Sequence, residues 1–205
     1  MRTELVTPPA SEAITVAEAA TNVFGDATYD ATKLTRNIKT ARIAAELYCE
    51  RAFINQTWKA TFEGFPTVNK YNRLAAIYLP KGKIQSITSI QYVDQDEAMQ
   101  TLTEGTHFEL ENTGIPGRVV LKEGQSWPST SSNTYEAVTV TFVAGEGSSL
   151  DSSKFDDVRD AMMAMIGDLY EVRQNLTPQQ VYNNNMYANI LAPHKIYFDF
   201  DLYNG

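Results

Sequence analysis

The fold is decided by a short stretch, residues 53–66, which reads FINQTWKATFEGFP. Within it, Trp58, Ala60 and Phe62 alternate with other residues at a spacing of two, which is the periodicity of a β-strand. The residues before this stretch instead repeat every three or four positions, which is the periodicity of an amphipathic helix. The stretch therefore predicts that a long helix ends near Ala52 and that a β-rich region begins almost at once.

Two helices are expected before this junction. The first has Thr15 as its N-cap and Glu18 three residues later, the spacing of a capping box, and Gly25 is expected to end it in the left-handed conformation. The second is expected from about Asp30 to Ala52. The apolar face of this second helix is narrow and rich in alanine, which suits close packing between helices. It is formed by Leu34, Ile38, Ala41, Ala45, Tyr48 and Ala52.

After the junction, turn signals such as Lys81-Gly82-Lys83 and Pro116-Gly117 separate short segments of strand-like composition. These segments predict an antiparallel, β-rich insertion. The strand candidates are residues 74–80, 84–94, 107–110, 117–121 and 136–145.

A third long helix is expected from about Phe155 to Arg173, and a weaker one is expected to begin with Thr177 as its N-cap. The apolar face of the third helix is formed by Phe155, Val158, Met162, Met165, Ile166, Leu169 and Tyr170. We therefore expect an α+β fold, in which a small helical bundle carries an antiparallel β-rich insertion between its second and third long helices. The expected ranges are 1–53 and 154–191 for the bundle, 54–147 for the insertion and 192–205 for an extended C-terminal arm.

The last residues, 196–203, alternate like a strand but have no obvious partner strand within the chain. Such a segment can add as a strand to the sheet edge of another subunit. The alternative is that it packs on the sheet of its own chain. Fully extended, residues 192–205 reach about 45 Å. The candidate partner-binding residues are Ile196, Tyr197, Phe198, Phe200, Leu202 and Tyr203.

Composition restricts the classes of function. The 205 residues carry a formal charge of −8, which disfavours sequence-specific DNA binding because duplex binding relies on cationic side chains. The N-terminus lacks the apolar region of a signal peptide, and no window is apolar enough to span a membrane, so we expect a soluble protein made in the cytoplasm. Cys49, the single cysteine, is expected to be a small apolar residue of the second helix.

No catalytic motif is present. His107 and His194 lie far apart without ligand-spaced partners, so neither a metal site nor a cofactor site is expected. Carboxylates cluster at 93–97 and 199–201; a pair doing acid–base chemistry is one interpretation, but a solvated hairpin turn and a soluble tail explain them better. Trp58 and Trp127 could stack on a ligand, although their spacing favours a core or an interface. We do not expect an enzyme.

Several segments together resemble the head-to-tail connector proteins of tailed bacteriophages, also called adaptor or head-completion proteins. The resemblance spans residues 3–173. It rests on the ordered combination of LVTPPASEAITVAEAA, ARIAAELYCERAFINQTWKATFEGFP, IYLPKGKIQSITSIQYVD, PGRVVL, WP, VTVTFVAG and DLYEVR.

The resemblance implies a helical bundle with a β-rich insertion that assembles as a ring, usually of twelve copies, beneath the portal. It implies that Trp58 and Phe65 anchor the sheet to the helices, and we group Trp127 with them as a structural anchor. Two departures limit it: LDSSKF replaces a proline-containing start of the third helix, and residues 174–205 extend beyond the point where many members stop.

The predicted function is thus a structural adaptor in the virion neck, which joins capsid to tail and extends the DNA channel. Its predicted partners are the portal protein, a stopper or tail-terminator protein and further copies of itself, with DNA passing through without sequence-specific contact. The alternatives are another neck or tail component, such as a stopper or tail-terminator ring, a small carboxylate hydrolase acting on polysaccharide, and a DNA-binding packaging factor.

Overall fold

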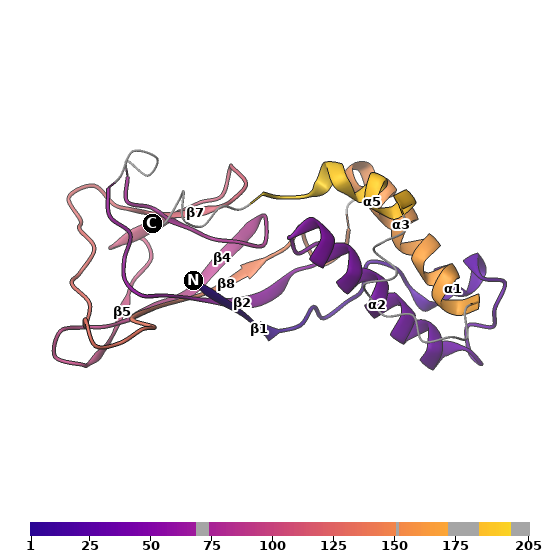
Figure 1. Ribbon diagram of the computed structural model, residues 1–205, viewed down its shortest axis with the longest axis horizontal. Helices are drawn as coiled ribbons and strands as arrows, with labels where there is room; N and C mark the ends of the chain where they lie inside the picture. Colours follow the sequence, from indigo (N-terminus) through magenta and orange to yellow (C-terminus); the bar gives the residue numbers. More distant parts are fainter. Residues whose placement is uncertain (69–73, 151, 172–184, 198–205) are drawn as a thin grey trace. The chain divides into compact units, whose positions relative to one another are not determined.

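The computed structural model describes residues 1–68, 74–150, 152–171 and 185–197, and its internal contacts divide the chain into two compact units (Figure 1). The helical unit comprises Ala10–Ile54 and Glu146–Lys195. The sheet unit comprises Met1–Pro9, Asn55–Gly145 and, within the described residues, 196–197. This α+β architecture is the predicted fold class, and all strands except an N-terminal one lie between the second and third long helices.

The helical unit contains α1 (Val16–Asn22), α2 (Ala31–Cys49), α3 (Ser152–Glu171), α5 (Asn185–Leu191) and a short 3-10 helix, η1 (Ala192–His194). α2 packs against α1, α3 and α5, and α3 also packs against α5 (Figure 1). The helix predicted from Thr177 begins outside the described residues, and α5 covers only the end of that prediction.

The predicted capping box of α1 is confirmed. The Thr15 hydroxyl accepts a hydrogen bond from Glu18 N at 3.2 Å, and the Glu18 carboxylate accepts one from Thr15 N at 2.8 Å. The predicted end of the helix is wrong, because Phe24 rather than Gly25 adopts the left-handed conformation, with φ of 52°. Gly25 instead lies close to α3: a Cβ there would be 3.0 Å from the Tyr170 hydroxyl, so a larger residue would require that side chain to shift.

α2 ends at Cys49, three residues earlier than predicted. Glu50 adopts the left-handed conformation (φ 55°), and the backbone N–H of Arg51 returns to the Glu46 carbonyl at 3.1 Å. The Glu46 carboxylate then accepts a hydrogen bond from Phe53 N at 3.0 Å. Because the chain is held on both sides of this bend, helix gives way to strand within a few residues.

The core of the helical unit is formed by the predicted helix stripes. Leu34, Ile38, Ala41 and Ala45 of α2 are buried, as is Cys49. α3 begins at Ser152, before the predicted start, and has a non-helical φ of −135° at Phe155. Its predicted apolar face is confirmed as buried or partly buried core: Phe155, Val158, Met162, Met165, Ile166, Leu169 and Tyr170.

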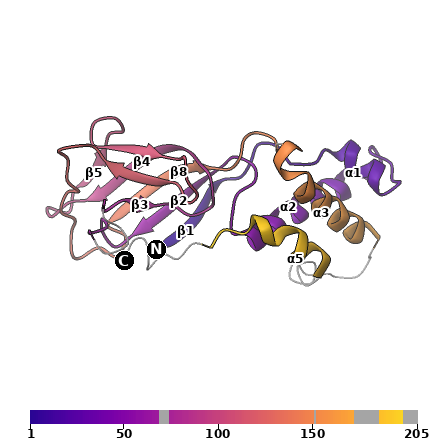
Figure 2. The ribbon, with the colours of Figure 1, turned by 90° about the horizontal axis from the view of Figure 1, so that it is seen from above.

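The sheet unit contains a five-stranded antiparallel sheet in the order β1-β2-β8-β4-β5. Figure 2 shows β4, β8, β2 and β1 side by side. The strands are β1 (Arg2–Thr7), β2 (Gln56–Phe62), β4 (Ile84–Val93), β5 (Met99–Leu102) and β8 (Val138–Ala144).

A smaller antiparallel sheet has the order β3-β7-β6, with β3 (Ile77–Tyr78), β7 (Arg118–Leu121) and β6 (Phe108–Glu111). Each predicted strand segment therefore overlaps a strand. β5 and β1 were not predicted as strands, since both are short edge strands with mostly exposed side chains. Pairing of β1 with β2 places the first nine residues with the sheets, whereas the predicted ranges grouped them with the helices.

Candidate assembly surfaces

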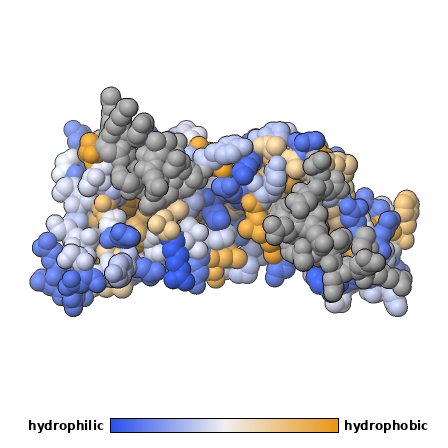
Figure 3. Space-filling view, viewed as in Figure 1, coloured by the Kyte–Doolittle hydropathy of each residue, from blue (hydrophilic) through white to orange (hydrophobic). Residues whose placement is uncertain are grey.

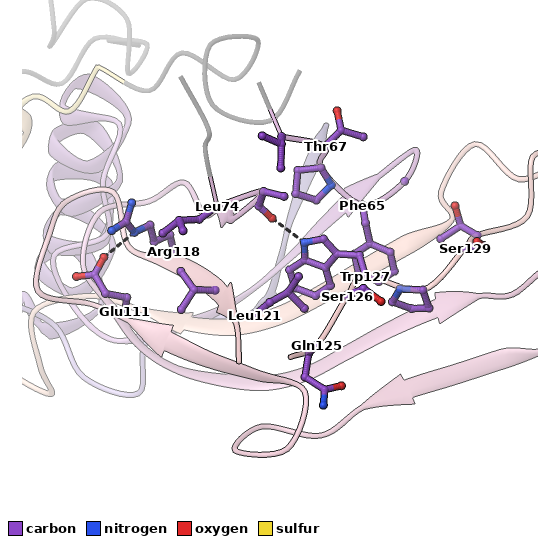
Figure 4. A pocket seen from close by; sticks show the side chains of 17 residues that line it. Phe65, Thr67, Leu74, Glu111, Arg118, Leu121, Gln125, Ser126, Trp127 and Ser129 are labelled. Carbon is purple, nitrogen blue, oxygen red and sulfur yellow. Dashed lines mark hydrogen bonds and ion pairs between the residues drawn. The ribbon is translucent and has the colours of Figure 1, made fainter. Parts of the chain in front are cut away.

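An open groove of about 1080 Å³ lies beside the smaller sheet of the sheet unit (Figure 4). One side is formed by the end of β7 and the other by the loops around Phe65 and Trp127. Its lining is mainly apolar and includes Phe65, Val68, Leu74, Val120, Leu121 and Trp127.

The position of Trp127 is fixed by two contacts. Its ring stacks on Phe65, with centroids 4.7 Å apart and planes inclined by 5°, and its indole N–H donates to the Ala75 carbonyl at 2.6 Å. The rings of Phe65 and Tyr92 of β4 pack edge to face, with their centroids 5.6 Å apart. Phe65 and Trp127 are thus brought together within the sheet unit, although 62 residues separate them in the sequence.

An ion pair closes one end of the groove. Arg118 Nε donates to Glu111 Oε2 at 2.7 Å, and Arg118 Nη1 lies 3.1 Å from the Tyr78 hydroxyl. Hydrogen bonds from Thr113 and then Arg118 lower the pKa of Glu111, while the contact with Tyr78 and the pairing with Glu111 raise the pKa of Arg118. Both groups are therefore charged at neutral pH, and Glu111 is neither a free acid nor a free base.

The groove does not provide the two carboxylates that a glycoside hydrolase needs, since Glu111 is the one carboxylate among its described lining residues. The carboxylate cluster at 93–97 instead shapes the β4–β5 turn. There, hydrogen bonds from the Gln100 amide and from Ala98 N and Asp96 N lower the pKa of Asp94. The predicted interpretation of this cluster as a hairpin turn fits that geometry, whereas residues 199–201 lie outside the described residues.

The other candidate chemical groups have structural surroundings. Burial raises the pKa of the Cys49 thiol to about 12, so it is a core residue and not a nucleophile. His107 Nδ1 accepts from Thr103 N at 3.0 Å, within the same turn. Within the described residues, no three His, Cys, Asp or Glu side chains are grouped as metal ligands, and no helix is long and apolar enough to cross a membrane.

The first residues of the predicted extended arm, 192–205, are not extended: Ala192–His194 form η1, and the helical unit continues to Lys195. His194 Nε2 lies 2.7 Å from Asp157 Oδ2, and Lys195 Nζ lies 3.2 Å from Glu50 Oε1. Burial alone would raise the pKa of Asp157, but the hydrogen bonds from His194 and from the backbone of Val158 lower it overall. The arm therefore leaves the helical unit at residue 196.

The predicted site residues fall into two groups. Trp58 on β2 is half-buried, opposite Leu5 and Phe142, and Lys81 Nζ lies 4.6 Å from its ring centre. Ile196 is half-buried and Tyr197 is exposed. The remaining residues of the predicted arm lie outside the described residues: Phe198, Phe200, Leu202 and Tyr203. That Trp58 and Phe65 anchor the sheet to the helices stays a prediction, as does partner binding by the arm.

Comparison of the sequence with protein-family models finds no match, and comparison with curated proteins finds none either. Comparison of the fold with solved structures does find matches. A chain in a structure of the neck of an empty gene transfer agent (GTA) particle, computed with C6 symmetry, matches with a TM-score of 0.71 at 18% identity. A chain in the virion of the native GTA particle matches with a TM-score of 0.69 at 18% identity.

A chain in the neck of the native GTA particle, computed with C12 symmetry, matches with a TM-score of 0.67 at 20% identity. Each match covers 97% of this chain and 97% of the other. The chain therefore has the fold of chains found in necks and virions of gene transfer agent particles. This is the class of fold that the resemblance to head-to-tail connectors predicted.

Proposed function

We propose that this protein is a structural adaptor that forms a ring beneath the portal of a phage-like particle, joins the capsid to the tail and extends the DNA channel. The observation that carries the proposal is the fold match over 97% of both chains to chains in neck structures of such particles. Those neck structures were computed with C6 and C12 symmetry, which is the cyclic symmetry that a ring around a channel requires.

The described surfaces support assembly more than chemistry. The groove has a single, already paired carboxylate, the cysteine is buried, and both histidines have local structural partners. The charge of −8 suits a channel along which DNA slides, because a basic wall would retain the phosphates. We infer an acidic lumen on this basis.

The C-terminal arm, residues 196–203, is proposed to dock on an adjacent subunit or on the next neck or tail component. The contacts of His194 and Lys195 fix the point from which it leaves. Its alternating sequence is suited to adding a strand to a sheet edge through backbone hydrogen bonds.

The experiment that tests the adaptor role is the mass of the complex formed when the purified chain is mixed with the portal ring of its own particle. We expect a gain of about twelve chains per portal ring, the copy number that the resemblance to connector proteins implies. A version ending at Leu191 serves as the comparison, and loss of cohesion between subunits in that version alone assigns the arm to ring locking. If the portal gains no mass at any ionic strength, the adaptor role is wrong. Binding to an isolated tail or stopper instead would favour another neck component.

A further inference from the structure

Two aromatic side chains of the helical unit point into solvent from the loop between α1 and α2. Phe24 is 100% exposed and Tyr29 is 91% exposed. Figure 3 shows a hydrophobic side chain protruding at the α1 end of the helical unit, beside polar ones. An aromatic ring in water forgoes the burial that normally stabilises it, so this pair needs an explanation beyond the fold of the monomer.

The loop is well fixed, so these exposures do not reflect a frayed end. One oxygen of Asp26 accepts hydrogen bonds from the backbone N–H groups of Thr28 and Tyr29, each at 2.7 Å. Asp30 Oδ2 accepts one from Asp26 N at 3.1 Å and another from the Tyr170 hydroxyl at 2.7 Å. The backbone of the loop is therefore fixed before any partner arrives, which reduces the entropy lost on binding.

The backbone at Phe24 adds to this argument. Its φ of 52° lies in the left-handed region, which disfavours a residue with a bulky side chain. An asparagine or glycine would occupy that conformation at lower cost. A strained backbone that carries a fully exposed aromatic ring is the combination expected at an interaction surface.

A complementary surface lies on the outward side of α2 in the same unit. Ile43 is 37% exposed and Leu47 is 58% exposed, and their spacing of four places them on one face of the helix. Lys39 and Arg36, one and two turns before Ile43 on the same face of α2, are also exposed. This face, formed by Arg36, Lys39, Ile43 and Leu47 and here called the α2 face, thus combines apolar area with positive charge.

We propose that the α1–α2 loop of one copy docks on the α2 face of a second copy, with Phe24 and Tyr29 against Ile43 and Leu47, and Asp26 toward the cations. The charges are opposite, and each surface also exposes two large apolar or aromatic side chains. Tyr29 and Ile43 are 14 residues apart, about 21 Å along a helix, so a copy cannot bring its own loop onto its own face.

The contact joins two different patches and is therefore heterologous, the kind that forms a ring when its rotation closes. The inference deepens the proposed function by naming a contact between neighbouring subunits. Nucleic acid and anionic membranes fit the loop less well, because Asp26 is negatively charged and hydrogen bonds from Tyr29 and Thr28 lower its pKa.

The test places p-benzoylphenylalanine, a photoreactive aromatic residue, at position 24. Chains of normal and heavy isotope composition are mixed, irradiated both free in solution and on the portal ring, and digested with trypsin. We expect cross-links between chains of different isotope composition that join residue 24 to the peptide 43–51. The same group at Tyr135, an equally exposed aromatic residue of the sheet unit, is the matched control and is expected not to label this peptide.

A second variant separates docking from folding. Phe24→Asn removes the ring and retains a residue that tolerates the left-handed backbone, so we expect self-association to weaken about tenfold or more while the thermal midpoint stays equal or rises. Lys39→Glu is expected to weaken association as well, since it reverses a charge facing Asp26.

The outcomes are distinguishable from those of the adaptor experiment. Rings that form on the portal while residue 24 labels another peptide, or labels no second chain, overturn the docking proposal and leave the adaptor role intact. Labelling of 43–51 in the free chain together with no mass gained by the portal supports the docking surface and overturns the adaptor role. Unchanged self-association of Phe24→Asn contradicts the proposal in either setting.

Discussion

The helical unit places two arginines in its interior, whereas the ion pairs described in the sheet unit lie at or near its surface. Arg42 is 3% exposed and contacts two carboxylates, with Nε 2.6 Å from Glu12 Oε2 and Nη1 2.7 Å from Glu46 Oε2. Arg51, also buried, pairs with Glu146. In the sheet unit, by contrast, Lys59–Glu4 and Arg2–Glu136 have at least a third of each side chain in water.

The difference follows from how each unit is closed. The helical unit is built from two separated parts of the chain, Ala10–Ile54 and Glu146–Lys195. The segments that connect its helices are not joined by the backbone hydrogen bonds of a sheet. Arg42 links the segment before α1 to α2, and Arg51 links the end of α2 to the strand-to-helix return. In the larger sheet, backbone ladders already join neighbouring strands, so ion pairs add little.

The largest effect is expected from Arg42→Met. It leaves Glu12 and Glu46 partly buried without their cation, so we expect a loss of about 3–5 kcal/mol in the free energy of unfolding. Burial alone would lower the pKa of Arg42, but hydrogen bonding to Glu12 and the two negative charges raise it, so the guanidinium is charged throughout the usual pH range. Urea denaturation of the free chain measures the change.

Arg36→Met, on the exposed side of the same helix, is the matched control for Arg42→Met and should stay within about 0.5 kcal/mol of the wild type. Equal effects of the two substitutions would contradict the comparison between buried and exposed charges.

A smaller loss is expected in the sheet unit from Trp127→Ala. The substitution removes the stack on Phe65 and the hydrogen bond to Ala75, and since Trp127 is only half-buried, we expect about 2 kcal/mol rather than the larger cost of a core tryptophan. Trp127→Phe retains an aromatic ring and should lose about 1 kcal/mol. The same denaturation experiment applies, and an Ala variant as stable as the Phe variant would show that the stack contributes nothing.

The capping box of α1 should contribute about 1 kcal/mol, which Thr15→Ala removes in part by deleting the hydroxyl acceptor. Thr21→Ala, in the exposed last turn of the same helix, is the control, and its effect should be smaller. Thermal unfolding followed by circular dichroism can rank the two, and the reverse order would refute the assignment.

Glu18 gives the capping box a pH dependence. Its pKa is lowered, first by the hydrogen bond from the Thr15 backbone, then by the Thr15 hydroxyl and by Arg159. A folded pKa below the unfolded value of about 4.3 means that the stabilisation is complete above that pH and is lost as pH falls through the folded pKa. The stability difference between wild type and Glu18→Gln should therefore shrink on acidification below about pH 4, and a difference that grows there would contradict the sign.

The smallest effect is expected from Glu4→Gln at the edge strand β1. Its carboxylate pairs with Lys59 at 2.8 Å, both side chains are exposed to water, and the hydrogen bond and charge of Lys59 lower the pKa of Glu4. We expect no measurable change at physiological salt and a slight loss only at low salt. A loss comparable to that of Arg42→Met would remove the distinction between the two units.

The sequence predicted the features that depend on near neighbours. The capping box requires only Thr15 and Glu18, and the stripe of α2 requires only a repeat of three and four residues. The strand β2 follows from alternation alone. The edge strand β1 could not be predicted in this way, since exposed positions on a short strand leave no pattern of burial.

The candidate surfaces were only partly predictable, because they depend on contacts between residues that are distant in the sequence. Phe65 and Trp127 stood out as aromatic residues, but their stacking depends on a fold that joins distant segments. Gly25 was expected to end the first helix in the left-handed conformation, but the structure has Phe24 in that conformation and fully in solvent.

By itself, the sequence determined the fold class, the three helices α1, α2 and α3, the strands other than β1 and β5, and the change from helix to strand after α2. Each of these depends on residues that are near one another in the chain. Only the tertiary structure decided that the first residues complete the sheet, that Arg42 and Arg51 are buried with their carboxylates, and that Phe24 and Tyr29 are held outward. Those features join residues that are distant in the chain, and local periodicity carries no information about which distant partner a side chain meets.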